Sequence, residues 1–261
     1  MTPIPRGPAH PVQLRLPTYR RGHSGKMATV RIHRGRVIQD ALDILDEEGL
    51  DGLTMRVLAK RLKIQAPSLY WHFANKQDLV DALADALMEP VARQLDLRAD
   101  WQRVLTDLAH EIRRALLARR DGGRVFAGTY PPLANILRVG EALMSCLRRA
   151  GGSPKFAAWG TFSASYFITG FVMEEQAFDQ TKSYATMDLA ARRKAILSFS
   201  SDSHSQAYRD ALPALFDKDF DSRFEFGFSI ILRGIESKLK EDPSGENAAE
   251  SKRRPTKSAK R

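Results

Sequence analysis

Residues 65–76 read QAPSLYWHFANK, a stretch that is short, aromatic and polar at once. Pro67 suits the first turn of a helix, where the N–H that proline lacks would have no partner. Tyr70, Trp71 and His72 then place three planar side chains with polar tips in a row. Because one helical turn cannot direct all three into a core, we predict a short helix of about two turns with at least one of these rings on the surface.

The segment before this stretch predicts a second short helix. Residues 53–62 hold Leu58 and Leu62 four positions apart on one face, basic side chains elsewhere, and Thr54 as an N-terminal cap. The connector 63–65 is brief. Two short helices joined by a tight turn are typical of a helix-turn-helix, whose second helix enters the major groove of DNA while basic residues contact phosphates.

Helical patterns continue on both sides of this pair. Apolar residues recur at helical spacing over 34–48, and Gly49 ends that pattern. Asn75 caps a longer helix that runs through Leu87, with Asp78 three residues on as a variant of the capping box. We therefore predict an all-α fold. Later helices begin at Trp101 and cover 134–150, 156–178 and 220–239, and one short helix covers roughly 188–199.

Charge gives weaker evidence than this motif. The chain has 261 residues, 43% of them apolar, a net charge of +10 and a pI near 9.9, which suits a polyanionic partner. However, residues 1–27 carry +5 and residues 242–261 carry +3 of that charge. Most of the excess therefore lies in two tails, and the prediction of DNA binding rests on the helix-turn-helix pattern.

Several classes of protein are disfavoured by what the sequence lacks. Cys146 is the only cysteine, which excludes a disulfide framework and suggests a buried, inert thiol. The six histidines show no ligand spacing, so we expect no metal and no cofactor. No apolar run approaches the length of a membrane span, and the N-terminal segment lacks a secretory apolar region. A soluble cytoplasmic protein without a membrane partner is expected.

Residues 34–83 resemble the DNA-binding head of the TetR family of bacterial transcriptional regulators, and the Leu-Tyr-Trp-His form is similar to its tetracycline-repressor subgroup. Parts of 114–131 and 224–227 resemble the body of that subgroup. The resemblance implies a homodimer on double-stranded operator DNA, in which helices 156–178 and 220–239 of two copies form a four-helix interface. The resemblance of residues 34–83 to the DNA-binding head rests on Gly49-Leu50-Asp51-Gly52-Leu53-Thr54, Arg56, Leu58-Ala59, Leu62, Ile64, Pro67-Ser68-Leu69-Tyr70-Trp71-His72 and Asn75-Lys76.

The predicted second helix supplies most of the candidate DNA contacts. For the groove we expect Ser68, Tyr70 and His72, while Ala66 and Pro67 can meet thymine methyl groups. For positioning on the DNA backbone we expect Arg56, Tyr70, Trp71 and Lys76. Trp71 has an alternative interpretation as a half-buried packing residue beneath the helix.

The body departs from the metal-chelating pattern that the resemblance implies. Phe126 stands at the family's metal-binding histidine, Tyr130 at its arginine, and Ala92 and Tyr166 at further histidine contacts, while Glu174 alone keeps its acidic character. We therefore expect a small hydrophobic effector rather than a magnesium chelate of tetracycline. The candidate ligand-binding residues are Phe126, Tyr130, Phe162, Tyr166, Phe171 and Glu174. The alternative is that these aromatic rings simply fill the core.

The predicted organisation has four parts: a disordered basic extension at 1–30, a helix-turn-helix domain at 31–92, a ligand-binding and dimerisation domain at 93–241, and a disordered basic tail at 242–261. Met27 is an alternative start. The leading hypothesis is a repressor released from its operator by the effector. An enzyme is disfavoured because no phosphate loop, nucleophile elbow or paired His/carboxylate motif is present. An architectural DNA binder that takes no ligand is supported only by the basic tails.

Overall fold

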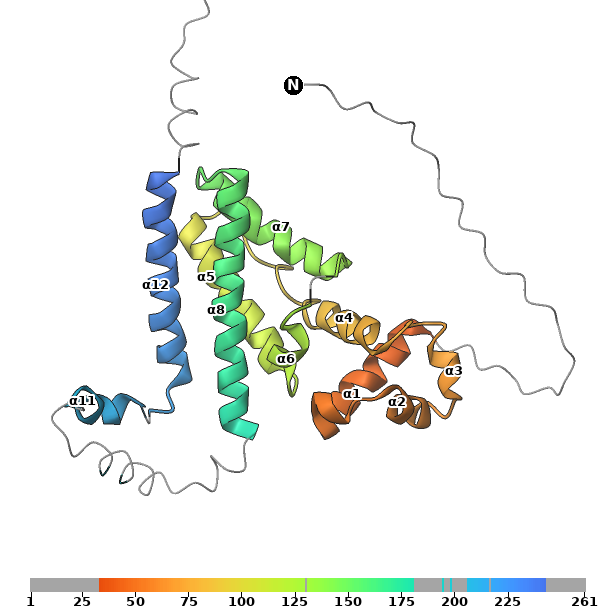
Figure 1. The fold of residues 1–261 in the computed structure, drawn as a ribbon. Coiled ribbons are helices and arrows are strands. Elements are labelled where there is room, and N and C mark those ends of the chain that lie inside the picture. Colours follow the sequence, from red (N-terminus) through yellow and green to blue (C-terminus); the bar gives the residue numbers. More distant parts are fainter. Residues whose placement is uncertain are drawn as a thin grey trace, which may run out of the picture. The chain divides into compact units, whose positions relative to one another are not determined.

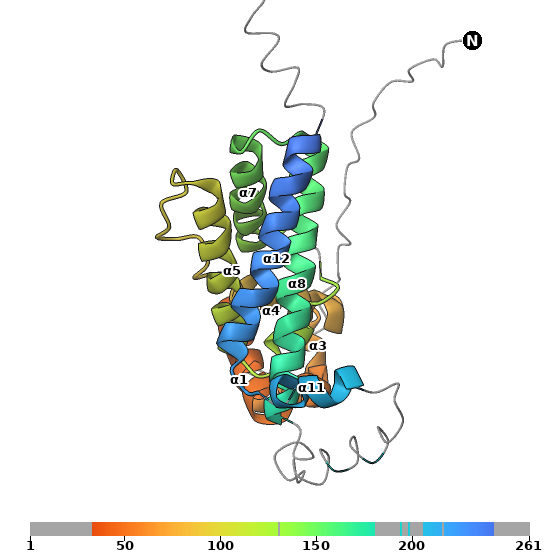
Figure 2. The ribbon, with the colours of Figure 1, turned by 90° about the vertical axis from the view of Figure 1, so that its left-hand side faces the viewer.

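The structure is a computed structural model that describes residues 33–129, 131–180, 194, 198, 206–215 and 217–242. Every regular element within these residues is a helix, which confirms the predicted all-α fold (Figures 1 and 2). The expected extension 1–30, nearly all of the expected helix in 188–199, and the tail beyond residue 242 lie outside the described residues.

Four helices form the N-terminal part of the described residues. They are α1 (Arg34–Gly52), α2 (Met55–Arg61), α3 (Ala66–Leu69) and α4 (Lys76–Leu87). Two of them, α2 and α4, begin at the caps that the sequence predicts. Thr54 Oγ1 accepts a hydrogen bond from Val57 N at the start of α2, and Asn75 Oδ1 accepts one from Asp78 N at the start of α4. Gly49 adopts φ +76°, a conformation that favours glycine, and this interrupts α1 where the sequence predicts its end.

One apolar core joins these four helices. Val37 and Leu45 of α1, Leu58 of α2 and Leu83 of α4 are fully buried. Leu69 and Phe73 bury their side chains in the same core, from the end of α3 and the turn after it. Because α3 is only one turn long, this burial rather than its own backbone hydrogen bonds holds it in place.

Among the described residues, six further helices form the part that follows α4. They are α5 (Trp101–Leu117), α6 (Gly122–Phe126), α7 (Ala134–Arg149), α8 (Pro154–Gln180), α11 (Gln206–Leu215) and α12 (Phe220–Glu241). The two long helices α8 and α12, green and blue in Figures 1 and 2, run side by side. The sequence predicts α5, α7, α8 and α12. Helices α6 and α11 were not expected, because five and ten residues give little periodicity to recognise.

A group of phenylalanine rings, the phenylalanine stack, joins α8 to α12 through tilted and edge-to-face contacts between the two helices. Phe167 and Phe171 of α8 lie 5.6 and 5.2 Å, centroid to centroid, from Phe224 of α12. Gly227 permits this approach, since a Cβ there would stand 2.6 Å from the Phe167 ring.

An ion-pair network centred on the buried side chain of Arg113 lies against the phenylalanine stack. Arg113 of α5 donates from Nη2 and Nε to the two carboxylate oxygens of Glu175, at 2.7 and 3.0 Å, and from Nη1 to Asp221, at 2.6 Å. Burial disfavours the charge of Arg113, yet the hydrogen bonds that it donates to Glu175 and Asp221 outweigh this effect and raise the pKa of the guanidinium. The network therefore ties α5, α8 and α12 together.

Candidate DNA-reading face and effector cavity

The helix predicted over the Tyr-Trp-His stretch is shorter than expected. Helix α3 covers Ala66–Leu69, a single turn rather than about two. The chain continues in hydrogen-bonded turns, with His72 N and Phe73 N both donating to Leu69 O at 2.8 and 3.0 Å. The burial of Phe73 in the core draws the backbone inward here, so the helix cannot extend to Asn75.

The burial of this stretch separates an anchoring face from an outward face. Leu69 and Phe73 are buried, whereas Tyr70 is 54% exposed and Trp71 is 89% exposed. The interpretation of Trp71 as a half-buried packing residue is therefore wrong. Pro67 and Ser68 are also exposed, and Ala66 and His72 are half-buried.

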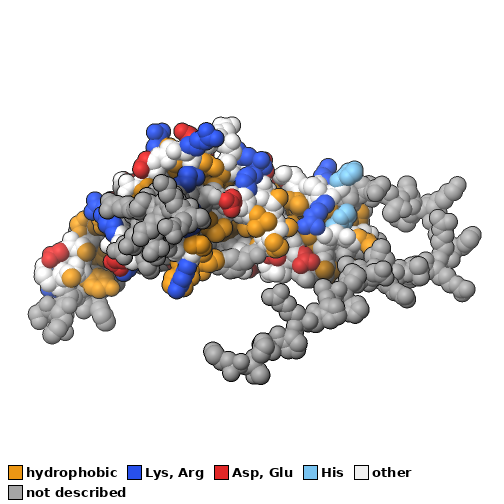
Figure 3. Space-filling view, turned by 90° about the horizontal axis from the view of Figure 1, so that it is seen from above, with side chains coloured by type: hydrophobic (Ala, Val, Ile, Leu, Met, Phe, Trp, Pro, Cys, Tyr) orange, Lys and Arg blue, Asp and Glu red, His pale blue; other side chains and the backbone are white. Residues whose placement is uncertain are grey.

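Arg34 fixes this outward face to the start of α1. Its Nη1 donates to the carbonyl oxygen of His72 at 3.2 Å, and its guanidinium lies 4.5 Å from the centre of the Phe73 ring. Contacts of this kind order the turn that carries Tyr70 and Trp71 without using either side chain. In Figure 3, basic and histidine side chains gather at the right-hand end of the surface.

The basic residues near this face fall into two groups. Arg56, Lys60 and Lys63 are exposed and have no ion-pair partner among the described residues, so their charges are available to phosphates. Arg61 instead forms two hydrogen bonds with Glu47, at 2.6 and 2.8 Å, and this contact lowers the pKa of the Glu47 carboxyl. Lys76 donates from Nζ to Leu50 O at 3.1 Å, so in this structure it supports the end of α1.

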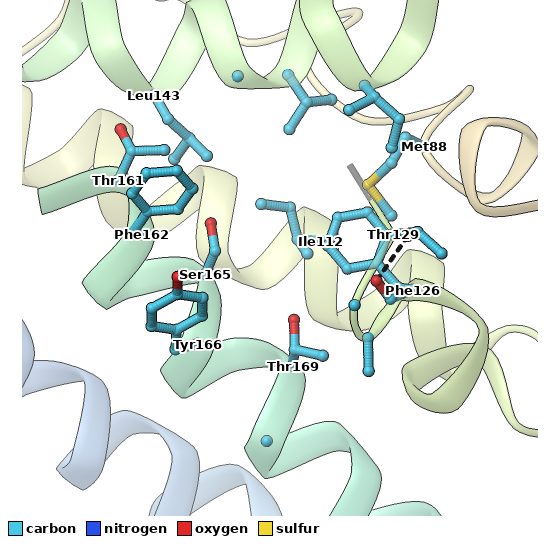
Figure 4. A pocket seen from close by; sticks show the side chains of 16 residues that line it. Met88, Ile112, Phe126, Thr129, Leu143, Thr161, Phe162, Ser165, Tyr166 and Thr169 are labelled. Carbon is cyan, nitrogen blue, oxygen red and sulfur yellow. Dashed lines mark hydrogen bonds between the residues drawn. The ribbon is translucent and has the colours of Figure 1, made fainter. Parts of the chain in front are cut away.

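A cavity of about 280 Å³ lies between the end of α4 and helices α5 to α8 (Figure 4). Three of the predicted ligand-binding residues line it: Phe126, Phe162 and Tyr166. The rings of Phe162 and Tyr166 stack at 5.8 Å and are 43% and 60% exposed, so they form the open side of the cavity. The remaining apolar wall is Met88, Ile112, Ile136, Val139 and Leu143.

Two predicted ligand-binding residues lie elsewhere, and this is a correction. Phe171 packs in the phenylalanine stack between α8 and α12, and Glu174 is exposed to solvent, so neither lines the cavity. Glu175 is the acidic residue whose side chain is buried at this point of α8, and it pairs with Arg113. Tyr130 lies outside the described residues.

The cavity also holds polar residues that the sequence interpretation missed. Thr161, Ser165 and Thr169 line it from α8, and Thr129 lines it from the loop after α6. The first three are spaced by four residues in a mostly apolar part of the helix, so one face carries a hydroxyl group on each successive turn. That spacing is the signal by which they could have been found.

Apolar side chains also cover the outer surface of α8 and α12. Trp159 and Tyr166 of α8 are 63% and 60% exposed, and Phe226 and Ile230 of α12 are 70% and 55% exposed. Large apolar side chains gathered on one face are typical of an interaction surface. They stand on the two helices that the sequence predicts for the dimer interface.

The described residues show neither a cluster of metal ligands nor a helix suited to a membrane. No group of three or more His, Cys, Asp or Glu side chains there could hold a metal ion. None of the described helices combines the length and the apolar character that crossing a bilayer requires.

Comparisons with known proteins agree with this geometry. Residues 37–83 match the family model of bacterial regulatory proteins of the tetR family, and residues 96–239 match that of the tetracyclin repressor-like C-terminal domain. The class A tetracycline repressor protein from transposon 1721 of Escherichia coli is 38% identical over 209 residues, which cover 78% of this chain and 91% of that protein.

Two solved structures extend the comparison to three dimensions. A possible TetR family regulator from Streptomyces coelicolor A3(2) is 38% identical with a TM-score of 0.69, over 78% of this chain and 99% of that one. A TetR variant from Acinetobacter baumannii AYE, crystallised with minocycline, is 34% identical with a TM-score of 0.61, over 80% of this chain and 99% of that one.

Proposed function

The chain belongs to the tetR family of bacterial regulatory proteins, and from this premise we propose that it occupies its operator as a repressor until an apolar small molecule enters the body. It is a ligand-responsive, DNA-binding transcriptional regulator that acts as a homodimer. The single observation that carries the effector half of the proposal is the aromatic cavity in which Met88, at the end of α4, lies opposite Phe162 and Tyr166. The proposed parts are 31–92 for DNA reading and 93–241 for effector binding and dimerisation.

The outward face of α3 is the proposed reading surface. Ser68, Tyr70 and His72 are proposed for the groove, with Ala66 and Pro67 near thymine methyl groups. Arg56, Trp71 and Lys76 are proposed for the DNA backbone; of these, Arg56 is exposed and lacks an ion-pair partner among the described residues, and Lys76 would have to leave Leu50 O to reach a phosphate. In a dimer, two such faces must stand about 34–36 Å apart to meet successive major grooves.

Contacts between α4 and α7 are the proposed link between the cavity and the separation of the two reading faces. Asp85 of α4 accepts hydrogen bonds from Asn135 N and Ile136 N, at 2.8 and 3.0 Å, and from Asn135 Nδ2. Arg138 of α7 donates to Met88 O at 2.7 Å. Because Ile136 and Val139 of α7 also line the cavity, a ligand that displaces α7 moves the end of α4 with it.

The energetic requirement is differential affinity. A ligand changes the operator affinity of the dimer only if it binds differently to the two states, in which the reading faces stand at different separations. The change is set by the ratio of the two ligand affinities, and bound operator DNA lowers the affinity for the ligand by the same factor. A coupling of about 1–3 kcal/mol, or roughly 5- to 150-fold in operator affinity, is the usual range.

The effector is proposed to be hydrophobic and free of a chelated metal. Phe126 stands in the cavity where the family resemblance places a metal-binding histidine, and a phenyl ring cannot coordinate a cation. The Acinetobacter baumannii structure is a complex with minocycline, and the proposed effector of this chain differs from a metal chelate. The family consists of regulators rather than enzymes, and we assign this chain no catalytic role. It is proposed to act in the cytoplasm, where its DNA is.

A two-part titration tests the proposal. Operator fragments selected from random duplexes by the full chain are bound in a fluorescence anisotropy assay, and a panel of apolar aromatic compounds is then added. We expect nanomolar to micromolar operator binding and at least one compound that raises the apparent Kd. If the chain binds operator, but none of the compounds releases the operator or stabilises the chain thermally, the effector half of the proposal is contradicted. A chain that selects no sequence contradicts the DNA half.

A further inference from the structure

Residues 1–32, which we call the basic segment, carry charge of one sign only. They contain no aspartate and no glutamate, and their basic residues are Arg6, Arg15, Arg20, Arg21, Lys26 and Arg31. Cations in such a run have no anion within the run to pair with, and basic N-terminal segments of this kind suit nucleic acid. A DNA duplex offers them one negative charge for about every 1.7 Å of its axis.

The described chain shows where the basic segment is attached. It begins at His33, which is exposed and directly precedes α1 with an extended backbone. The next residue, Arg34, contacts the turn after α3: its Nη1 donates to His72 O at 3.2 Å, and its guanidinium lies 4.5 Å from the centre of the Phe73 ring. The basic segment is therefore joined to the chain beside the proposed reading surface.

The acidic side chains of α1 offer the basic segment few partners. Three of them are already engaged by arginines of the described chain, at 2.5–2.9 Å: Asp40 by Arg36, Asp46 by Arg119 and Glu47 by Arg61. The exposed cations of α2 repel a positively charged segment, but they attract the same polyanion. A polyanion outside the chain therefore fits the basic segment better than its own head does.

The second basic tail begins far from the reading surface. Asp242, at the end of α12, accepts a hydrogen bond from Ser153 N at 2.7 Å, at the start of α8. The head meets the body near the other end of α8, where Gln176 accepts from Gly123 N of α6 at 3.0 Å and Arg124 of α6 pairs with α1. Residues 153 and 176 are about 35 Å apart along the helix. Figure 1 shows the end of α12 away from α1, α2 and α3.

We propose that the basic segment binds the sugar–phosphate backbone of the duplex next to the half-site that its own head occupies. This inference rests on the proposed reading surface and adds to it a second contact that is independent of sequence. A segment joined to a docked head meets the neighbouring phosphates at a high local concentration, so weak contacts suffice. Thirty-two residues can span at most about 110 Å, which is enough to pass beyond the base pairs under the head.

Two charge-neutral variants of the full chain test this inference. The first replaces the cations of the basic segment: Arg6→Gln, Arg15→Gln, Arg20→Gln, Arg21→Gln, Lys26→Gln and Arg31→Gln. The matched control replaces the same number of cations in the C-terminal tail: Lys252→Gln, Arg253→Gln, Arg254→Gln, Lys257→Gln, Lys260→Gln and Arg261→Gln. Both variants lose the same charge and change no described residue, so both should melt at the wild-type temperature.

Operator binding is measured by fluorescence anisotropy between about 50 and 200 mM salt. One duplex ends at the outer edges of the two half-sites, and the other extends by about one helical turn, roughly 10 base pairs, on each side. We expect the wild-type chain and the control to bind the longer duplex at least tenfold more tightly at low salt. The first variant should bind both duplexes equally, and its hydroxyl-radical footprint should shrink to the half-sites.

The salt dependence gives a second, independent readout. Each phosphate contact contributes about 0.9 to the slope of log K against log salt concentration. If each basic segment of the dimer makes at least two such contacts, the slope on the longer duplex should fall by about 3 or more in the first variant. The control should keep the wild-type slope, because its tail begins away from the DNA.

The outcomes separate this inference from the proposed function. If the first variant keeps the wild-type slope and the preference for the longer duplex, the basic segment does not bind DNA, while the reading surface stands. Equal losses in both variants would assign the effect to net charge alone and overturn the placement beside the half-site. If the wild-type chain selects no operator at all, the reading surface is overturned, and the inference falls with it.

Discussion

At the scale of single residues, Trp71 tests the reading face most cleanly. Its side chain is 89% exposed and makes no contact that holds the core, so its removal should cost little folding free energy. We expect Trp71→Ala to weaken operator binding about tenfold or more, which is about 1.4 kcal/mol, with an unchanged melting temperature. Tyr208→Ala, another exposed aromatic residue on α11, serves as the control. Equal operator affinity of Trp71→Ala and wild type would remove Trp71 from the interface.

Cys146 gives a second prediction at this scale. Burial raises the pKa of its thiol from 9.0 to about 11, and Sγ lies 3.1 Å from Trp101 O as a donor. The native thiol should therefore stay protonated and unreactive toward a disulfide reagent at pH 8, and react once the chain is unfolded. Because the unfolded thiol ionises first, the stability that this group contributes is lost as the pH rises from 9 towards 11. Rapid labelling of the native chain would contradict this burial.

At the scale of elements, the Asp85 contact between α4 and α7 is the proposed coupling. Asp85→Ala removes the acceptor of two amides at the start of α7 but leaves both the cavity wall and the reading face intact. We expect operator affinity without effector to change less than threefold, while the effector concentration for half-release rises about fivefold or more, the lower end of usual coupling energies. Asp107→Ala, in an exposed ion pair with Arg103, is the matched control. If the effector concentration for half-release of operator is unchanged in Asp85→Ala, the coupling through the contact between α4 and α7 is ruled out.

Elements also show how far the sequence could predict this site. Phe162 and Tyr166 both line the cavity because they are one turn apart on α8, and their role in ligand binding stays a prediction. Phe171 follows Tyr166 by five residues, which rotates it by about 140° around the helix, at roughly 100° per residue, and turns it toward α12. Thr161, Ser165 and Thr169 were missed because single polar residues in a mostly apolar part of a helix carry a weak hydropathy signal. Helix α6 was missed because Asp121 enters it with φ +57°, which no periodicity indicates.

At the scale of the whole molecule, the Arg113 network tests how the body is held together. Arg113→Met leaves Glu175 buried without a partner, so we expect a loss of about 3–5 kcal/mol of unfolding free energy in urea. Adding Glu175→Gln to Arg113→Met should recover part of that loss, because the residual charge is removed. An Arg113→Met chain as stable as wild type, or no recovery in the double variant, would mean that packing of the phenylalanine stack alone holds α5, α8 and α12.

The homodimer with two outward reading faces is the feature on which the regulatory account depends, and selection of bound sequences from random DNA duplexes measures it most directly. The full chain should enrich a twofold-symmetric sequence whose half-sites lie about one helical turn apart, and Trp71→Ala should enrich it far less. Recovery of no common sequence, or of a single unpaired half-site bound by one chain, would contradict the account.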